Sequence, residues 1–400
     1  MSSCRLVFAC IPALIGCEQI LGLSEPRGEG AELADGSTST GMDGKPGDDS
    51  SPQQACVQLP VFQAGTKYSV ANATEVHVAD IDHDGLLDLI ANTGTSSSSN
   101  TSWLAFPGTG AGQFGSARPF GIGITHMVIV DVDNDGFNDV VGAAPQAVIV
   151  RRQNSAQPGS SLPDQTISLP GATSVDVEVG RVNGDTLPDL LVHTGGAATV
   201  YFGRAGAPGE FDPGPAAEAF AHLVDIDGDG LADLATQTLS GVRISFNRAT
   251  APGVFDAPTT IGPDSNGGLG IFGHLNGNAP RMDLSLPTAT DTRVYTQATP
   301  RIFTEMAGTP FNIGGSAIYP ALIADINGDG RDDVFADRFA AFQCPTPGTF
   351  YPAAGPTQRF DIGRPGVRLF ADVDNNGKPD AIALTGQNGM TFNFIEVSLQ

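Results

Sequence analysis

Three features of the sequence predict an all-β fold. The chain has 51 glycines and 29 prolines among 400 residues, but only 16% of its residues are charged, a composition typical of many turns. Its apolar runs are short and rich in Val, Ile, Leu and Phe, as in strands. A nine-residue acidic frame also recurs seven times, at intervals of 44 to 51 residues. This spacing indicates one structural unit per frame, and so seven units.

Each unit shows the same order of short apolar segments around its frame. In the first unit, residues 75–79 (EVHVA) lead into the frame and residues 87–92 (LDLIAN) leave it. Residues 101–106 (TSWLAF) form a third segment, and residues 112–120 (GQFGSARPF) supply a Gly-x-Phe turn and a fourth strand. Because a lone four-stranded sheet buries little apolar area, neighbouring sheets must stack. We therefore predict a seven-bladed β-propeller of four-stranded antiparallel blades over residues 56–400.

The two ends of this domain are predicted to meet in one blade. Residues 59–70 (LPVFQAGTKYSV) resemble the fourth segments of the other units. The seventh unit ends soon after its third segment, residues 391–399 (TFNFIEVSL). A strand from residues 59–70 would complete the last blade and remove two exposed sheet edges.

The first 16 residues are predicted to be an export signal. Residues 6–16 form an apolar stretch of eleven residues, which is too short to cross a bilayer as a helix. Residues 14–17 (LIGC) resemble the lipobox of bacterial lipoproteins, which implies a lipid anchor on Cys17. Glu18 follows the cysteine, and we expect the outer membrane or the cell surface as the location. The alternative is an ordinary secretory signal, in which Cys17 is incidental.

Residues 17–55 are predicted to be a flexible tether, because Gly, Ser, Asp, Glu and Pro dominate and few large apolar residues occur. Loss of the signal and lipidation of Cys17 would leave Cys56 and Cys344 in the folded part. These two cysteines are a candidate disulfide in an oxidising compartment. Two free thiols are the alternative, because pairing requires Cα atoms within about 7 Å of each other.

The recurring frame has the residue types of a calcium loop. Side-chain oxygens at positions 1, 3 and 5, a glycine at 6, a main-chain carbonyl at 7 and a carboxylate at 9 can surround a hard cation. Five frames are complete, and we expect about five Ca²⁺ sites. Their predicted ligands are Asp80, Asp82, Asp84, Leu86 and Asp88; Asp131, Asp133, Asp135, Phe137 and Asp139; Asp225, Asp227, Asp229, Leu231 and Asp233; Asp325, Asn327, Asp329, Arg331 and Asp333; and Asp372, Asp374, Asn376, Lys378 and Asp380.

Other interpretations of the frames fit less well. An EF-hand needs a carboxylate at position 12 and flanking helices, but position 12 is Ala91, Gly142 or Thr236 in three frames. If the acidic turns were merely solvated, their carboxylates would repel one another without compensation. The frames hold 22 of the 44 acidic residues, and the net charge is −24. Such a surface should repel nucleic acid and anionic lipid, so neither is an expected partner.

Over roughly residues 57–400 the units resemble FG-GAP/VCBS repeats, the family that includes the propeller of integrin α subunits. The matching residues are the acidic frames, with Asn327 and Asn376 as oxygen-bearing replacements, and the Gly-x-Phe turns. The resemblance implies calcium binding, extracellular adhesion or recognition, and a surface protein or glycan as ligand. Two eroded frames, which begin at Arg181 and His274, depart from the pattern, and the resemblance carries no calcium site to them.

Catalytic motifs are absent: the chain has no GxSxG, HExxH or P-loop. Polar residues do recur three or five places before the frames, where alternation would put them on one face: Glu75, His77, His126, Asp176, Glu178 and His222. They are candidates for a metal or acid–base site near the central channel, or for inter-blade residues with satisfied hydrogen bonds. We predict a monomeric binding protein and no enzyme. The alternatives are an enzyme acting on polysaccharide at the channel mouth, and a structural member of an envelope assembly.

Overall fold

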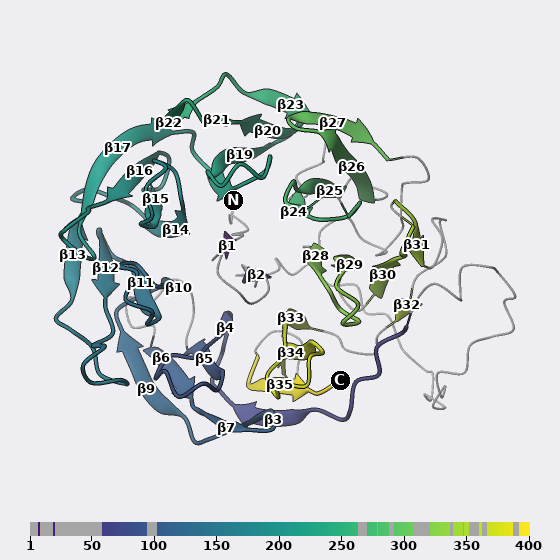
Figure 1. Ribbon diagram of the computed structural model, residues 1–400. Helices are drawn as coiled ribbons and strands as arrows, with labels where there is room; N and C mark the ends of the chain where they lie inside the picture. Colours follow the sequence, from purple (N-terminus) through teal and green to yellow (C-terminus); the bar gives the residue numbers. More distant parts are fainter. Residues whose placement is uncertain are drawn as a thin grey trace, which may run out of the picture.

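The chain forms a ring of seven sheets around a central axis (Figure 1). The computed structural model describes residues 7–8, 19–20, 58–93, 102–262, 270–277, 279–287, 292–306, 321–336, 339–346, 348–351, 360–361, 366–386 and 392–400. Strands are the only regular elements among these residues, and none of them forms a helix suited to crossing a membrane. The predicted all-β, seven-bladed propeller is confirmed.

Every blade places its first inner strand nearest the axis, and sheet order follows chain order outwards in blades 1 to 6; in blade 7 the outermost strand is the N-terminal β3. Blade 1 consists of β4 (Val76–Ala79), β5 (Asp88–Thr93), β6 (Ser102–Phe106) and β9 (Arg118–Ile122). Blade 2 consists of β10 (His126–Val130), β11 (Asp139–Ala144), β12 (Ala147–Arg151) and β13 (Gln165–Ser168). Blade 3 consists of β14 (Asp176–Gly180), β15 (Asp189–His193), β16 (Ala198–Gly203) and β17 (Phe211–Ala217).

The remaining blades follow the same antiparallel plan. Blade 4 consists of β18 (Ala221–Val224), β19 (Asp233–Thr238), β20 (Gly241–Ser245) and β23 (Thr259–Ile261), and blade 5 of β24 (Ile271–Gly273), β25 (Asp283–Pro287), β26 (Thr292–Thr299) and β27 (Ile302–Glu305). Blade 6 consists of β28 (Ala321–Ala324), β29 (Asp333–Ala336) and β30 (Phe339–Gln343), and both β31 (Phe350–Tyr351) and β32 (Phe360–Asp361) pair with β30. Blade 7 consists of β33 (Val367–Ala371), β34 (Asp380–Thr385), β35 (Phe394–Ser398) and β3 (Thr66–Ser69).

In three blades the aromatic segment of the Gly-x-Phe turn comes before the fourth strand instead of forming it. In blade 6, Phe350 lies in β31, which pairs with the end of β30, and β32 pairs with the start of β30. In blade 1, Phe114 belongs to a separate hairpin of β7 (Gly108–Gly110) and β8 (Gln113–Phe114), and the fourth strand starts only at Arg118. Blade 4 has the same arrangement, with β21 (Asn247–Arg248) paired to β22 (Ala251–Phe255) before the fourth strand. The chain continues beyond the third strand and pairs with the aromatic segment there, before it returns to the blade edge.

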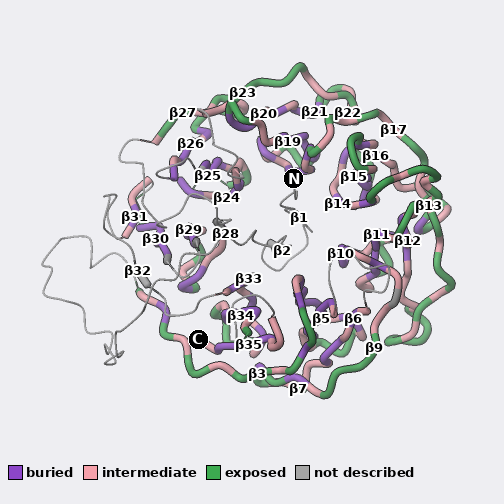
Figure 2. The backbone as a smooth tube through the Cα atoms, turned by 180° about the vertical axis from the view of Figure 1, so that it is seen from behind, coloured by how far each residue is buried: buried purple, intermediate pink, exposed green. Residues whose placement is uncertain are grey.

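The apolar core lies between adjacent blades. Val128 and Val141 of blade 2, for example, are buried in one cluster with Val177 and Val192 of blade 3. Inner strands such as β10 are buried along their whole length because each blade is covered on both faces. Exposed residues gather at the rim of the ring (Figure 2). This arrangement explains why the inner strands are continuous apolar runs.

Ring closure occurs in blade 7, as predicted. β3 lies against β35 in Figure 1, with Thr66 opposite Val397 and Ser69 opposite Phe394. Tyr68 of β3 also packs edge-on against Phe114 of blade 1, at 5.4 Å between ring centroids. The N-terminal strand therefore joins the last blade to the first.

The predictions for the N-terminal part are not tested by the fold. Of residues 1–55, the structure describes only β1 (Val7–Phe8) and β2 (Gln19–Ile20), which pair with each other. The signal, the tether and the lipid anchor at Cys17 otherwise lie outside the described residues. Cys344, which follows β30, is disulfide-bonded. Its predicted partner, Cys56, also lies outside the described residues, so that pairing stays a prediction.

Candidate metal centres

Each acidic frame forms the loop between the first and second strands of its blade. We number these loops 1 to 7 by blade, so loop 1 begins at Asp80 and loop 4 at Asp225. In the five complete loops, the position-1 aspartate accepts hydrogen bonds from the backbone amides at positions 5 and 6. The oxygen at position 5 accepts one from the amide at position 7. These bonds hold the side-chain oxygens around a common centre.

Two residues in each complete loop adopt the left-handed conformation. Position 6 was predicted to need glycine for this, and Gly85 has φ 87°. Position 4 requires it too, and there the sequence uses His83 at φ 59° and Asn134 at φ 58°. Gly and Asn tolerate this conformation best, and they fill position 4 in the other loops. This signal was present in the sequence but was not used.

The position-9 aspartates have a structural role in all seven loops, in addition to any role as ligands. Each is buried, and its Oδ1 accepts the backbone amide of a residue in the last part of the third strand or just beyond it, as Asp88 does from Gly108 at 2.7 Å. In six loops Oδ2 also accepts the position-2 amide. Burial raises the pKa of Asp139 to about 7 and that of Asp233 to about 8, because the backbone amides only partly offset the lost hydration.

Side-chain amides connect loops 1, 3, 4 and 5 to the next blade. Gln297, in the third strand of blade 5, donates from Nε2 to the carbonyl oxygen of Ile226 in loop 4 at 2.8 Å. Asn247 of blade 4 donates in the same way to Val182 in loop 3, also at 2.8 Å. Gln153 and Gln343 repeat this contact from blades 2 and 6. The loops are thus held in place from the neighbouring blade.

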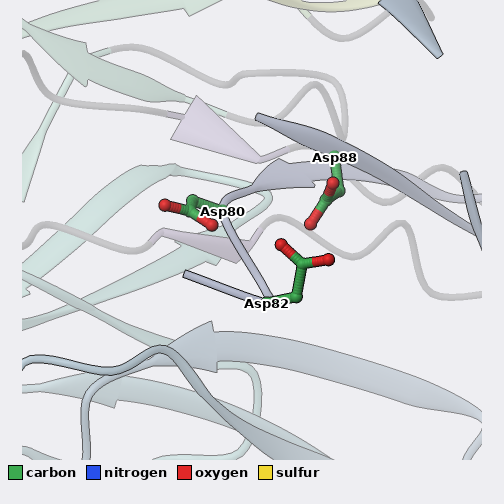
Figure 3. Close-up of side chains that lie close together, drawn as sticks. All are labelled: Asp80, Asp82 and Asp88. Atoms are coloured by element: carbon green, nitrogen blue, oxygen red, sulfur yellow. The ribbon is translucent and has the colours of Figure 1, made fainter. Parts of the chain in front are cut away.

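Loop 1 has the features of a divalent cation site. Figure 3 shows the carboxylates of Asp82 and Asp88 turned towards each other beside Asp80. Ligand oxygens of these three residues lie within 4.8 Å of one another. Oδ1 of Asp82 is buried and has no hydrogen-bond partner. Burial raises the pKa of Asp82, and the neighbouring carboxylates of Asp84 and Asp80 raise it further. A hard cation with oxygen ligands would compensate this unpaired charge.

Three other complete loops gather their acids in the same way. Their groups are Asp131, Asp133 and Asp139; Asp225, Asp227 and Asp229; and Asp372, Asp374 and Asp380. Loop 6 forms no such group among the described residues. There, Asn327 replaces an acid, and the guanidinium of Arg331 pairs with Asp329 inside the loop. The predicted ligands therefore do not form five equivalent sites.

Arginines form ion pairs with acids in two of the loops that gather three carboxylates. Arg152 Nη1 lies 2.8 Å from Oδ2 of Asp133 in loop 2. Arg301 Nε lies 2.5 Å from Oδ2 of Asp227 in loop 4. Neither pairing was anticipated from the sequence. The described residues place no arginine or lysine in an ion pair with the acids of loops 1 and 7.

The eroded loops keep their shape by hydrogen bonds. In loop 3, Asn183 Nδ2 donates to Asp185 Oδ2 at 2.9 Å, and the Asp185 amide donates back to Asn183 Oδ1 at 3.0 Å. In loop 5, the His274 amide donates to Asp332 of the next blade at 2.7 Å. Neither loop collects three acids among the described residues.

The predicted inner polar residues form contacts between blades. Oε1 of Glu75 lies 2.6 Å from Nε2 of His77 and 2.9 Å from Nδ1 of His126 in blade 2. His126 approaches Asp176 of blade 3 at 3.7 Å. Glu75, His77 and His126 are buried. The predicted alternative of inter-blade residues with hydrogen-bond partners thus describes them better than an open site at the channel.

Glu178 forms a second contact of this kind. Its Oε1 lies 2.7 Å from Nδ1 of His222 in blade 4 and 3.6 Å from Nε2 of His193. Burial opposes ionisation of Glu178, but His222 and His193 outweigh it and hold its pKa at about 2. His126 and His77 outweigh burial in the same way and hold the pKa of Glu75 at about 2. Both carboxylates are therefore ionised partners of the histidines.

A cleft of about 280 Å³ opens between blades 1 and 2, beside loop 1. Asp82, Arg118, Phe120, Gln153 and Gly159 are among its lining residues. Oε1 of Gln153 is buried without a hydrogen-bond partner, and the charge of Arg118 acts on the carboxylate of Asp82. The cleft therefore offers both hydrogen-bond acceptors and donors beside an aromatic ring.

Comparisons with known proteins identify the repeat. Residues 131–192, from loop 2 to the second strand of blade 3, match the FG-GAP-like repeat family. No curated protein matches the sequence. A solved structure of a lectin from Agrocybe aegerita that recognises non-reducing terminal N-acetylglucosamine is similar, with a TM-score of 0.51 and 18% identity, over 80% of this chain and 92% of that chain. BBS1N in complex with ARL6DN has a TM-score of 0.44 and 12% identity, over 85% of this chain and 97% of that chain. These likenesses concern the fold alone.

Proposed function

We propose that this propeller, which carries an FG-GAP-like repeat, is a calcium-binding recognition module that binds a glycan at the surface of a bacterium. The observation that carries the proposal is the position of the cleft directly beside loop 1. Asp82 belongs to both the acidic group and the cleft wall, so a cation in the loop would order one side of a ligand site. Hydroxyl groups both donate and accept hydrogen bonds, which suits a cleft lined by an unpaired acceptor and the guanidinium of Arg118.

Two further observations support binding over catalysis. Of the residues that could act as acid and base, Glu75, His77, His126 and Glu178 are buried between blades, where a polysaccharide has little access, whereas His222 is partly exposed. The Agrocybe aegerita lectin recognises a terminal sugar on a propeller of related fold, so this architecture is compatible with glycan recognition. We therefore propose no enzymatic activity. The net charge of −24 disfavours nucleic acid as a partner.

We also propose that Cys17 carries a lipid and that residues 17–55 hold the propeller away from the outer membrane. A tether of this composition would have a root-mean-square reach of roughly 35 Å. Metabolic labelling with a radioactive fatty acid should mark the wild-type chain and not Cys17→Ser. Label on the Cys17→Ser variant would contradict this assignment. We expect the propeller itself to be a monomer.

A glycan array probed with the full chain, in calcium and in chelator, tests the proposed function. Binding should require calcium, and Arg118→Ala and Phe120→Ala should each weaken it about tenfold, as expected for central contact residues. Arg204→Ala, at an exposed arginine of blade 3, is the control. Sugar release from the array, or binding that persists unchanged in chelator, would overturn the proposal.

A further inference from the structure

We propose that Arg301 is the built-in cation of loop 4, so that an arginine of blade 5 takes the place that calcium is proposed to take in loop 1. The proposal rests on the calcium binding proposed above. On this proposal, Arg301 holds blades 4 and 5 together at loop 4 without a metal ion, and we call this contact the latch. The proposal also predicts that one of the acidic groups is closed to calcium in the wild-type chain.

Arg301 is anchored over loop 4 by its own backbone. It lies in the turn between β26 and β27 with φ 65°, a left-handed conformation that a non-glycine residue adopts only when its surroundings hold it. Its amide donates to Oε1 of Gln297 at 2.6 Å. Gln297 in turn donates from Nε2 to Ile226 of loop 4 and to Met282. The turn therefore places Arg301 at a set position above the loop.

The guanidinium occupies the ligand side of the loop. Nε contacts Oδ2 of Asp227 at position 3 at 2.5 Å, and Nη2 lies 3.6 Å from Oδ2 of Asp229 at position 5. Nη2 also donates to the carbonyl oxygen of Asn247 at 2.8 Å, and the group stacks 4.9 Å from the ring centroid of Phe246. The side chain of Asp227 is 4% exposed, so its charge is paired away from water. Nη1 also lies 3.3 Å from Oδ2 of Asp256. A fixed cation thus already lies against two of the four acids of the loop.

Loop 1 provides an internal comparison. Gln153 corresponds to Gln297, because each donates its backbone amide to a position-9 aspartate and its side-chain amide to a position-2 carbonyl. The segment that follows Gln153 contains Gly159, whose Cβ would lie 3.6 Å from Cβ of Asp82. Where loop 4 has the guanidinium, loop 1 has the cleft and the unpartnered Oδ1 of Asp82. The space beside the position-3 aspartate is thus filled by a guanidinium in loop 4 and unfilled in loop 1.

Removal of the arginine should expose a calcium site. Oxygens of Asp225, Asp227 and Asp229 lie within 4.8 Å of one another, as in the other acidic groups. A fixed positive charge beside them repels a divalent ion and shares one of its ligands. We therefore expect Arg301→Gln to bind one more calcium ion per chain, or to tighten one site at least about tenfold.

The experiment is calorimetric titration of the chelated full chain with calcium. Arg243→Gln is the matched control, because it removes the same charge from an exposed pair with Glu218 in blade 4. The gained site should be absent in this control and should disappear again in the double variant Arg301→Gln/Asp227→Asn. Arg301→Lys, which keeps the charge, is a second control and should bind no additional ion. Arg301→Met, which removes the charge but keeps an apolar side chain against Phe246, provides the test if the glutamine variant does not fold.

The outcomes separate this inference from the proposed function. An Arg301→Gln chain that binds the same number of ions as wild type with the same affinities, or fewer, would overturn the role of Arg301. If neither chain binds calcium, calcium binding fails, and the latch is then tested by thermal unfolding in chelator. There, Arg301→Gln should melt at a lower temperature than Arg243→Gln, and equal melting temperatures would refute the latch.

Discussion

The carboxylate of Glu75 in blade 1 lies 2.9 Å from Nδ1 of His126 in blade 2, and both side chains are buried. His126 continues this line to Asp176 of blade 3, and Glu178 links blade 3 to His222 of blade 4. Four consecutive blades are therefore joined near the axis by contacts between carboxylates and imidazoles. Since the apolar core lies between blades, these contacts stabilise the same interfaces through charge.

The glutamates predict a loss of stability in acid. The pKa values of Glu75 and Glu178 are both about 2 in the folded protein, against an ordinary value of 4.5. Because the folded pKa is depressed, their stabilisation is complete above about pH 4.5 and is lost as the pH falls towards 2. Each should contribute on the order of 2–3 kcal/mol. Urea unfolding between pH 7 and 3 should show a smaller fall for Glu178→Gln than for wild type, with exposed Glu305→Gln as control. An equal fall in both variants would contradict the assignment.

Calcium should stabilise the fold by binding in the complete loops whose acids form no ion pair with an arginine among the described residues, such as loop 1. With dissociation constants of about 0.1 to 1 mM, each site contributes roughly 0.4 to 1.4 kcal/mol at about 1 mM free ion. Asp82→Ala should remove that share of the calcium-dependent rise in melting temperature. Asn276→Ala, in eroded loop 5, should leave the rise nearly unchanged. Calorimetry with and without chelator measures both, and equal effects of the two variants would show that loop 1 is not a distinct site.

Ring closure by β3 should be essential. Deletion of residues 57–70 removes the fourth strand of blade 7, leaves β35 as an open edge, and takes Tyr68 from its contact with Phe114. The shortened chain should unfold or aggregate. Deletion of residues 25–50, in the predicted tether, serves as the control and should leave the melting temperature unchanged. If the two deletions had the same melting temperature, β3 would not be needed to hold the ring.

The side-chain amides between blades should hold neighbouring blades together. Gln297→Ala removes donors to Ile226 and Met282 and the acceptor for Arg301. Loss of such buried hydrogen bonds should cost about 2–4 kcal/mol. Gln157→Ala, at an exposed glutamine of blade 2, is the matched control. Urea denaturation compares them, and a Gln297→Ala chain as stable as this control would refute this role.

Cys344 is predicted to pair with Cys56. Cys344 is disulfide-bonded, and it follows the third strand of blade 6, next to the blade that β3 completes. Peptide mapping without reductant should recover residues around Cys56 linked to residues around Cys344. A peptide that links Cys344 to another cysteine would contradict the pairing.

Much of the fold followed from local signals. In the frame beginning at Asp80, the turn residues and the amides that bind the position-1 and position-5 carboxylates all lie within the nine positions, so the turn could be predicted without any distant contact. Regular recurrence of that frame then predicted the number of blades. The need for a left-handed residue at position 4 was equally local, in His83 and Asn134, and was missed because histidine and asparagine carry a weaker signal than glycine.

Contacts across the ring could not be predicted in this way. Arg301 and Asp227 are 74 residues apart and meet only because blade 5 stacks on blade 4 in a particular register. The sequence presents loops 1 and 4 as equivalent calcium frames. Stacking makes them differ, since a guanidinium from the next blade fills one and a glycine leaves the other open. Composition and period therefore determined the propeller and its acidic loops, whereas the packing of neighbouring blades decided which loop oxygens remain free for a cation.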